Sequence, residues 1–323
     1  MRRLLMVAAA CAVAFSTQAV AEWPEKPIKV VVPFKAGGTS DQTARIYQQA
    51  IKEANLLSQP ITVLNVGGHF SIGSRQVMEA DADGYNFLLV HIALMGGEGS
   101  GAMDFGWRNF DPVAATGEFC VLPMVRKDSG INTIQELLEK AKAEPDSMIF
   151  GANLGAINHM AGIMMEQASP GTKFRFVQIG GGTANFTALT GAQTNATVLS
   201  GAEVVRFTLL PDGSPNPDAQ IKALAYTGSK RLPALPDLPT MKEAGYDMEF
   251  CIKSWWFAPK GKPKEAIDGM AAALGKAMET DVVMKFNSDR YFTPVFLSGA
   301  DLQDDLDNTW KAIEPVAKLA AKK

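Results

Sequence analysis

The sequence predicts an α/β protein with a mostly parallel sheet, and three observations support this fold class. Short apolar, β-branched runs alternate with amphipathic helical segments along most of the chain. Glycine-rich or small polar loops follow successive predicted strands. The 323 residues suffice for two domains with sizeable cores, and no tandem repeat or low-complexity array is present. Ligands of such sheets collect at the carboxyl ends of the strands.

The first predicted strand, Ile28–Pro33, ends in a loop that reads Phe34-Lys35-Ala36-Gly37-Gly38-Thr39-Ser40-Asp41. The two glycines let the backbone approach a ligand closely, and the Thr-Ser-Asp cluster can cap the helix expected near Gln42–Asn55. The start of this helix supplies free N–H groups and about half a positive charge, which favour an anion. A plain strand-to-helix connection is an equally good interpretation of this stretch.

The next two strand exits also carry glycine or histidine. A strand over Gln59–Asn65 leads into Val66-Gly67-Gly68-His69-Phe70-Ser71, and the apolar strand Tyr85–Val90 ends at His91. Most histidines have a packing or surface role, but His69 and His91 follow strands of the predicted sheet, where ligands bind. Ligand contact and packing are therefore equally good interpretations of these two residues. His159 falls inside a predicted helix, so we expect it to pack or to cap.

A second α/β unit is predicted to begin near Phe119. It opens with a strand over Cys120–Arg126, a turn, and an amphipathic helix that carries Ile134 and Leu138 on one face. Three more strands follow, then two further strands, and the chain beyond Pro263 is mostly helical. The three strands, Met148–Ala152, Phe174–Ile179 and Thr194–Leu199, exit into Asn153–His159, Gly180–Thr183 and Ser200–Glu203; the two further strands are Ile221–Tyr226 and Phe250–Ala258.

The N-terminus has the pattern of a secretory signal peptide. Met1-Arg2-Arg3 precedes the apolar run Leu4–Phe15, and Ala19-Val20-Ala21 provides a small-residue cleavage site, which we place before Glu22. A lipid attachment site at Cys11 is a minor alternative that lacks the usual leading leucine. No other stretch approaches the roughly 18 apolar residues that a membrane span needs. We therefore expect a soluble periplasmic protein.

The chain is acidic, with 31 basic and 34 acidic residues, and loss of Arg2 and Arg3 makes the mature protein more so. This charge argues against nucleic acid and anionic membranes as partners. It does not exclude an anionic ligand, because local backbone dipoles decide that. The mature chain keeps Cys120 and Cys251. These two cysteines either form a disulfide or remain as two buried thiols, and we slightly favour the thiols.

Motifs of catalytic and nucleotide sites are absent from the sequence. There is no Gly-x-Gly-x-x-Gly, Gly-Lys-Ser/Thr or Gly-x-Ser-x-Gly, the three histidines lack metal-site spacing, and no cysteine pair has it either. We predict no enzymatic activity, no cofactor and no metal. The loops carry few charged side chains besides Lys35 and Glu203. Backbone donors suit a buried carboxylate, because each hydrogen bond to a charged group contributes about 1.5–3 kcal/mol.

Several motifs in order resemble one known family over essentially the whole mature chain. They are Trp23-Pro24-Glu25-Lys26-Pro27-Ile28, Val31–Asp41, Asp83-Gly84-Tyr85, Gly180-Gly181-Gly182 with Ala188-Leu189-Thr190-Gly191, Arg231–Thr240, and Ser254-Trp255-Trp256-Phe257-Ala258-Pro259. In these residues the chain is similar to the substrate-binding proteins of tripartite tricarboxylate transporters, also called Bug-type receptors.

The resemblance implies a type II periplasmic-binding-protein fold, in which two α/β domains joined by two crossing strands close on a carboxylate. It implies a receptor that captures a di- or tricarboxylate, acts as a monomer and delivers the ligand to permease subunits in the membrane. The crossing strands would lie near Val121–Met124 and Trp255–Phe257. The implied division is a signal peptide over 1–21, a first domain of 22–121 plus 256–323, and a second domain of 122–255.

The strand exits and the resemblance together give the expected ligand-binding residues. In the first domain they are Phe34, Lys35, Gly37, Gly38, Thr39, Ser40, Asp41, Gly68, His69, Phe70, Ser71 and His91; in the second they are Asn153, Ala156, Ile157, Asn158, Gly181, Gly182, Thr183, Ser200, Gly201 and Glu203.

Two stretches depart from the family pattern. Asn65–Ser71 replaces an Asn-Arg-Pro-Gly-Ala-Gly-Gly loop, so His69 and Phe70 are expected to reshape the pocket. Asn195–Ala202 lacks the aspartates that relatives use for a ligand ammonium group, which favours a purely anionic, citrate-type ligand. Two alternatives stay open: a receptor that signals to a sensor partner, and an enzyme that acts on a carboxylate with His91 as its base.

Overall fold

The computed structural model describes residues 23–321, and the predicted signal peptide at 1–21 lies outside this range. Strands and helices alternate along most of the chain, which confirms the predicted α/β class. The elements are β1 (Ile28–Val32), α1 (Thr39–Glu53), β2 (Ile61–Asn65), α2 (Phe70–Met78), β3 (Asn86–Val90), α3 (Ala93–Ser100), η1 (Trp107–Asn109), β4 (Phe110–Arg126), η2 (Lys127–Ser129), α4 (Ile134–Ala143), β5 (Met148–Ala152), α5 (Ile157–Ala168), β6 (Phe174–Gln178), α6 (Gly182–Thr190), β7 (Ala196–Ser200), α7 (Gly201–Thr208), β8 (Ile221–Ala223), β9 (Cys251–Pro259), α8 (Lys264–Met278), α9 (Asp281–Arg290), β10 (Thr293–Leu297) and α10 (Gly299–Ala320).

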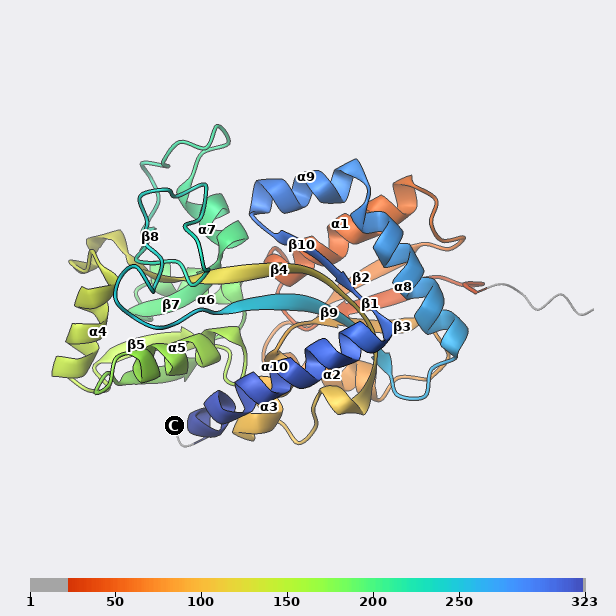
Figure 1. Ribbon diagram of the computed structural model, residues 1–323, viewed down its shortest axis with the longest axis horizontal. Helices are drawn as coiled ribbons and strands as arrows, with labels where there is room; N and C mark the ends of the chain where they lie inside the picture. Colours follow the sequence, from red (N-terminus) through yellow and green to blue (C-terminus); the bar gives the residue numbers. More distant parts are fainter. Residues whose placement is uncertain (1–22, 322–323) are drawn as a thin grey trace, which may run out of the picture.

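The molecule has two lobes, which Figure 1 shows at opposite ends of the long strands β4 and β9. The first lobe holds the strand order β2-β1-β3-β9-β4, with β10 also paired to β4, and the second holds β4-β7-β5-β6, with β8 also paired to β4. β1, β2 and β3 are mutually parallel, as are β5, β6 and β7, so their carboxyl ends share an edge in each lobe. This arrangement directs the strand exits of both lobes toward the gap between them.

β4 and β9 are the crossing strands. They pair antiparallel from Phe110 with Pro259 to Cys120 with Cys251, after which β4 continues into the second lobe and pairs with β7 from Val121 to Val125. The expected crossing segments therefore belong to strands that join the two lobes. The limits proposed for the two domains, 22–121 plus 256–323 and 122–255, stay a prediction.

α1 begins three residues earlier than the sequence suggested. Its N-cap is Gly38, which has no side chain to accept a hydrogen bond, and Thr39, Ser40 and Asp41 lie in the first turn. The expectation that the Thr-Ser-Asp cluster caps this helix is therefore wrong. Asp41 instead accepts from the Gly37 N–H at 2.7 Å and pairs with Arg45 one turn later at 2.8 Å. The Asp41 carboxylate stabilises the glycine loop and does not cap the helix.

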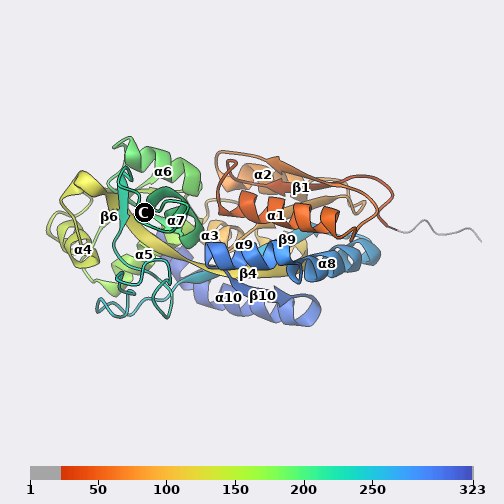
Figure 2. The ribbon, with the colours of Figure 1, turned by 90° about the horizontal axis from the view of Figure 1, so that it is seen from above.

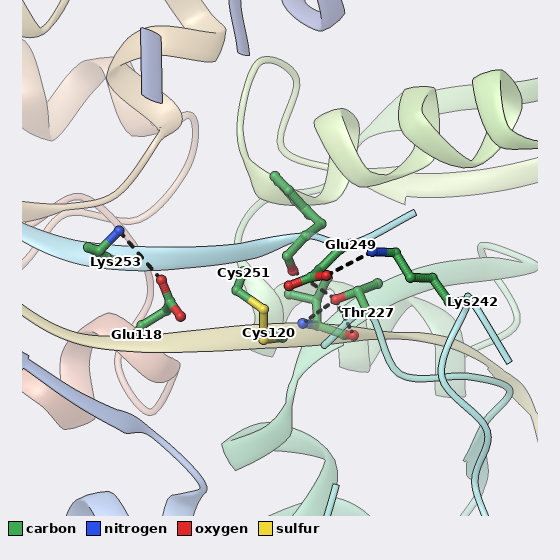
Figure 3. The surroundings of a disulfide bond; sticks show 9 residues. Glu118, Cys120, Thr227, Lys242, Glu249, Cys251 and Lys253 are labelled. Atoms are coloured by element: carbon green, nitrogen blue, oxygen red, sulfur yellow. Dashed lines mark hydrogen bonds and ion pairs between the residues drawn. A yellow bond between two sulfur atoms is a disulfide. The ribbon is translucent and has the colours of Figure 1, made fainter. Parts of the chain in front are cut away.

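The two cysteines form a disulfide, Cys120–Cys251, with 4.0 Å between their Cα atoms. The slight preference for free thiols is therefore wrong. The two residues face each other as partners in the register of β4 and β9, which the spacing of 131 residues in the sequence could not reveal. Figure 3 shows the bond beside Thr227, whose Oγ1 lies 3.0 Å from Val121 N and 2.8 Å from Phe250 O.

A large core packs between the sheets and helices, with Trp255, Trp256, Phe87 and Tyr47 among its fully buried side chains. α1 packs against α8 and α9 on one side of the first-lobe sheet, whereas α2 and α10 both pack against α3 on the other side, as Figure 1 shows. Figure 2 shows the long strand β4 passing from one lobe to the other. α10 packs against both α3 and α5, so it contacts both lobes. Within residues 23–321, no helix combines the length and apolar character needed to cross a membrane.

Candidate functional site

A cavity lies between the lobes, where the strand exits meet. Its volume is about 50 Å³, measured as the space that water centres can occupy. Such a volume exceeds that needed for one water molecule several-fold, so the cavity is small but not collapsed. The lining residues are Phe34, Lys35, Gly38, Thr39, Ser40, His91, Phe119, Val121, Ala156, Ile157, Asn158, Gly181, Gly182, Thr183, Val198, Ser200 and Glu203.

Four helices direct their N-termini into this cavity, one from the first lobe and three from the second. Three of them, α1, α5 and α6, have N-cap residues that provide no side-chain hydrogen bond: Gly38, Ala156 and Gly181. The first N–H groups of these helices have no acceptor within the helix, and the helix dipoles place partial positive charge there. The cavity thus presents backbone donors from both lobes, which is the environment an anion prefers.

The fourth helix, α7, is capped from within. Ser200 Oγ accepts from Glu203 N at 3.2 Å, and Glu203 Oε2 accepts from Ser200 N at 3.1 Å, which is a reciprocal capping box. The Glu203 side chain is buried, and burial raises the pKa of its carboxyl above the ordinary value, against the lowering effect of the Ser200 hydrogen bonds and the Arg206 charge.

His91 contributes a neutral ring to the cavity wall. Its Nδ1 accepts from Ala93 N at 3.2 Å, so the ring proton resides on Nε2, and the ring stacks on Phe34 at 4.8 Å between centroids. Burial lowers the pKa of His91 to about 3, so the ring carries no charge at neutral pH. A neutral imidazole can donate a hydrogen bond to a ligand without bringing a second ion that must be desolvated.

Thr183 supplies a further polar group. Its Oγ1 is buried and has no hydrogen-bond partner among the described residues. Asn158 also lines the cavity, and one N–H of its Nδ2 donates to Val198 O at 2.8 Å. An unpaired buried hydroxyl is costly, so a ligand oxygen near Thr183 would recover that free energy.

Hydrogen bonds between the lobes hold the cavity shut. Thr39 Oγ1 and Ser200 Oγ lie 2.5 Å apart, and Arg206 Nη1 donates to Gly37 O at 2.7 Å. On another part of the seam, His69 Nε2 donates to Leu154 O at 3.0 Å. These contacts join the first lobe to the loops and helix starts of the second. Because the two lobes touch across the cavity, the structure is in a closed conformation.

Most of the expected binding residues line the cavity, and the others lie at the seam or in the core. Gly37, Gly68, His69 and Ser71 belong to the seam: Ser71 N donates to His69 Nδ1 at 3.3 Å, which caps α2. Phe70 is fully buried in the core, Asn153 accepts from Gln178, and Gly201 faces Leu232. Asp41 braces the first loop, as described above. His159 packs on Phe176 and accepts from Gly155 N, as expected.

Sequence inspection missed three lining residues, Phe119, Val121 and Val198. They lie on β4 and β7 and form the apolar floor of the cavity. Each is an apolar strand residue of a type common in protein cores, so the sequence does not indicate that its side chain faces a ligand cavity. Among residues 23–321, no group of three or more His, Cys, Asp or Glu side chains could hold a metal ion.

Comparison with known proteins places the chain among binding proteins. Residues 43–318 match the family described as the tripartite tricarboxylate transporter family receptor. A relative from Agrobacterium vitis, a UPF0065 protein in the TAR-I ttuE-ttuC' intergenic region, is 30% identical over 317 residues, which cover 94% of this chain and 86% of that protein.

Solved structures agree with this match. The periplasmic binding protein BugD is 27% identical and superposes with a TM-score of 0.78 over 92% of this chain and 98% of its own. An R. palustris protein solved with adipate is 24% identical, with a TM-score of 0.79 over 93% and 98% of the two chains. The second likeness shows the fold alone. Together they confirm the two-domain periplasmic-binding-protein architecture.

Proposed function

The chain belongs to the tripartite tricarboxylate transporter receptor family, and from this premise we propose that it captures a di- or tricarboxylate in the periplasm and delivers it to membrane permease subunits. The observation that carries the proposal is the convergence of α1, α5 and α6 on one buried cavity with N-caps that offer no side-chain acceptor. A carboxylate would accept hydrogen bonds from these N–H groups and would lie at the positive ends of three helix dipoles.

The ligand would bind through both lobes. Gly38, Thr39 and Ser40 belong to the first lobe, whereas Ala156, Gly182 and Thr183 belong to the second, so an acid with carboxylates at two ends would bridge them. Such a ligand binds the closed form more tightly than the open form and shifts the population toward closure. The adipate in the R. palustris structure is a dicarboxylate of this kind, which supports the choice of class.

An enzyme with His91 as general base is the less favoured alternative. A general base works best when its pKa is near the working pH, whereas burial lowers the pKa of His91 to about 3. Its Nδ1 is also committed to Ala93 N. A receptor that signals to a sensor partner would use the same cavity, and no observation on the molecule favours it over transport.

Substitution of Gly38 tests the proposed site. A Cβ atom at this position would lie 3.5 Å from both Glu203 Oε1 and Thr183 Oγ1, so Gly38→Ala fits the fold, whereas Gly38→Leu would fill the cavity. The readout is the melting temperature with adipate, malate, succinate or citrate in excess. At 100 times Kd a ligand stabilises by about 2.7 kcal/mol, which raises Tm by several degrees.

We expect at least one acid to raise the Tm of the wild-type protein, and Gly38→Leu to abolish that rise while its ligand-free Tm stays close to that of Gly38→Ala. An unchanged rise in Gly38→Leu would show that the first loop does not bind the ligand. No response of the wild-type protein to any acid would contradict the proposed ligand class.

A further inference from the structure

One acidic side chain lies in a cavity otherwise suited to anions. Glu203 is only 4% exposed. Oε2 accepts from Ser200 N and Ser200 Oγ, each at 3.1 Å. Glu203 also interacts with the backbone of Thr39, so the carboxylate of the second lobe reaches the start of α1 in the first.

The neighbouring glycines, which have no side chain, leave room for this carboxyl group. A Cβ atom on Gly182 would overlap the Glu203 carboxylate, and one on Gly38 would lie 3.5 Å from its Oε1. Glu203 therefore sits at the point where the starts of α1, α6 and α7 meet. At the start of α1 it interacts with the Thr39 backbone, which a ligand carboxylate would otherwise contact.

Few charges in the cavity oppose that of Glu203. From its own helix, the Arg206 charge acts on the carboxylate, but Arg206 is exposed and its Nη1 donates to Gly37 O. From the first lobe, Lys35 and His91 are the other titratable residues that line the cavity. His91 is neutral, and Lys35 is an exposed residue. From α5 and α6, the described lining residues are uncharged.

We propose that Glu203 sets the charge that the cavity accepts: an organic acid with two or three negative charges binds together with one proton from solvent, which neutralises the Glu203 carboxylate. This inference rests on the proposed function and adds to it a coupling between ligand and proton. A negative charge placed beside the buried carboxylate disfavours its ionised form, so binding of the acid raises the pKa of Glu203 and draws a proton from solvent. The neutral carboxyl keeps Oε2 as an acceptor for Ser200 N, so the α7 cap survives.

The test compares the wild-type protein with Glu203→Gln. Adipate and citrate are titrated calorimetrically between pH 5 and pH 9, in pairs of buffers with different ionisation enthalpies, which yields the number of protons taken up on binding. Glu139→Gln is the matched control, because it removes the same charge from the exposed face of α4 in the same lobe.

For the wild-type protein and Glu139→Gln we expect net proton uptake on binding, with a maximum between the pKa of Glu203 in the free protein and its higher pKa in the complex. For Glu203→Gln we expect no proton uptake and binding at pH 8 at least about tenfold tighter than wild type, since removal of a repulsion of 1.36 kcal/mol already gives tenfold. The difference should shrink at pH 5, where Glu203 of the free protein is closer to protonation.

Each contrary result has a separate meaning. Wild-type binding without proton uptake at any pH overturns the role of Glu203 and leaves the proposed function intact, and this measurement does not depend on the folding of the variant. Equal affinities and equal pH profiles for wild type and Glu203→Gln overturn it as well. Failure of both acids to bind wild type or Glu203→Gln contradicts the carboxylate function itself, and the inference with it.

Discussion

His91 makes the stability of the protein depend on pH. An unfolded histidine has a pKa near 6.5, whereas burial lowers that of His91 to about 3. Between these values the unfolded chain binds a proton that the folded chain does not, so the free energy of unfolding falls as the pH is lowered from about 6.5 toward 3. At pH 4 this loss is about 3 kcal/mol, at 1.36 kcal/mol per pH unit.

The measurement is urea unfolding at pH 7 and pH 4 for the wild-type protein and His91→Asn. The Asn oxygen can still accept from Ala93 N, as His91 Nδ1 does, so the start of α3 keeps its acceptor. We expect the variant to lose about 3 kcal/mol less than wild type between the two pH values. Parallel losses would show that His91 is not the group responsible.

At the scale of residues, the sequence predicted which loops form the cavity better than it predicted which atoms face it. Fourteen of the lining residues were anticipated from strand exits and family resemblance, including Gly38, Thr183 and Glu203. The second glycine loop was expected to reshape the pocket, but its His69 donates to Leu154 O across the seam. A sequence gives the exit of a strand, whereas the direction of each side chain depends on packing across two lobes.

At the scale of elements, the long strand β4 was only half predicted. The expected strand began at Cys120, but β4 extends back to Phe110, and its pairing with β9 shifts register between Pro112 and Ala114 and again between Thr116 and Glu118. The first half of β4 was not predicted because it contains Pro112 and Gly117, and proline and glycine usually interrupt strands. Here they coincide with the register shifts, and Gly117 has a φ of +67°, so they serve as bulges in one continuous strand.

The disulfide fixes β4 to β9 where the strands pass between the lobes. We expect the double variant Cys120→Ser/Cys251→Ser to lose about 2–5 kcal/mol of stability, the range for removal of a native disulfide. Urea unfolding without reductant measures the loss. In excess reductant the two proteins should unfold at similar urea concentrations, which serves as the control. Alkylation of two cysteines in unreduced, unfolded wild-type protein would contradict the disulfide.

At the scale of the whole molecule, the closed form depends on bonds that cross the seam. Arg206 Nη1 donates to Gly37 O at 2.7 Å, and the Arg206 side chain does not line the cavity. Its removal should favour opening of the ligand-free protein without altering the cavity wall. For a partly exposed hydrogen bond worth about 0.7 kcal/mol, the ratio of open to closed molecules should rise about threefold.

Small-angle X-ray scattering of the ligand-free protein measures this change. We expect a larger radius of gyration for Arg206→Ala than for wild type. Arg175→Ala is the control, because Arg175 is an exposed arginine of the same lobe and lies on β6, the edge strand of the second-lobe sheet. Equal radii for Arg206→Ala and Arg175→Ala would show that the Gly37 contact does not hold the lobes together.

The position of β9 has a consequence for the order in which the chain acquires its structure. β9 lies between β3 and β4 in the first-lobe sheet, yet more than 120 residues of the second lobe separate it from β4 in the sequence. During synthesis, β1 to β4 leave the ribosome long before β9 does, so the first-lobe sheet lacks a central strand while the second lobe is being made. The second lobe is then the earlier of the two to have all its strands available, and the first is completed by a late, long-range insertion, the kind of step that folds slowly.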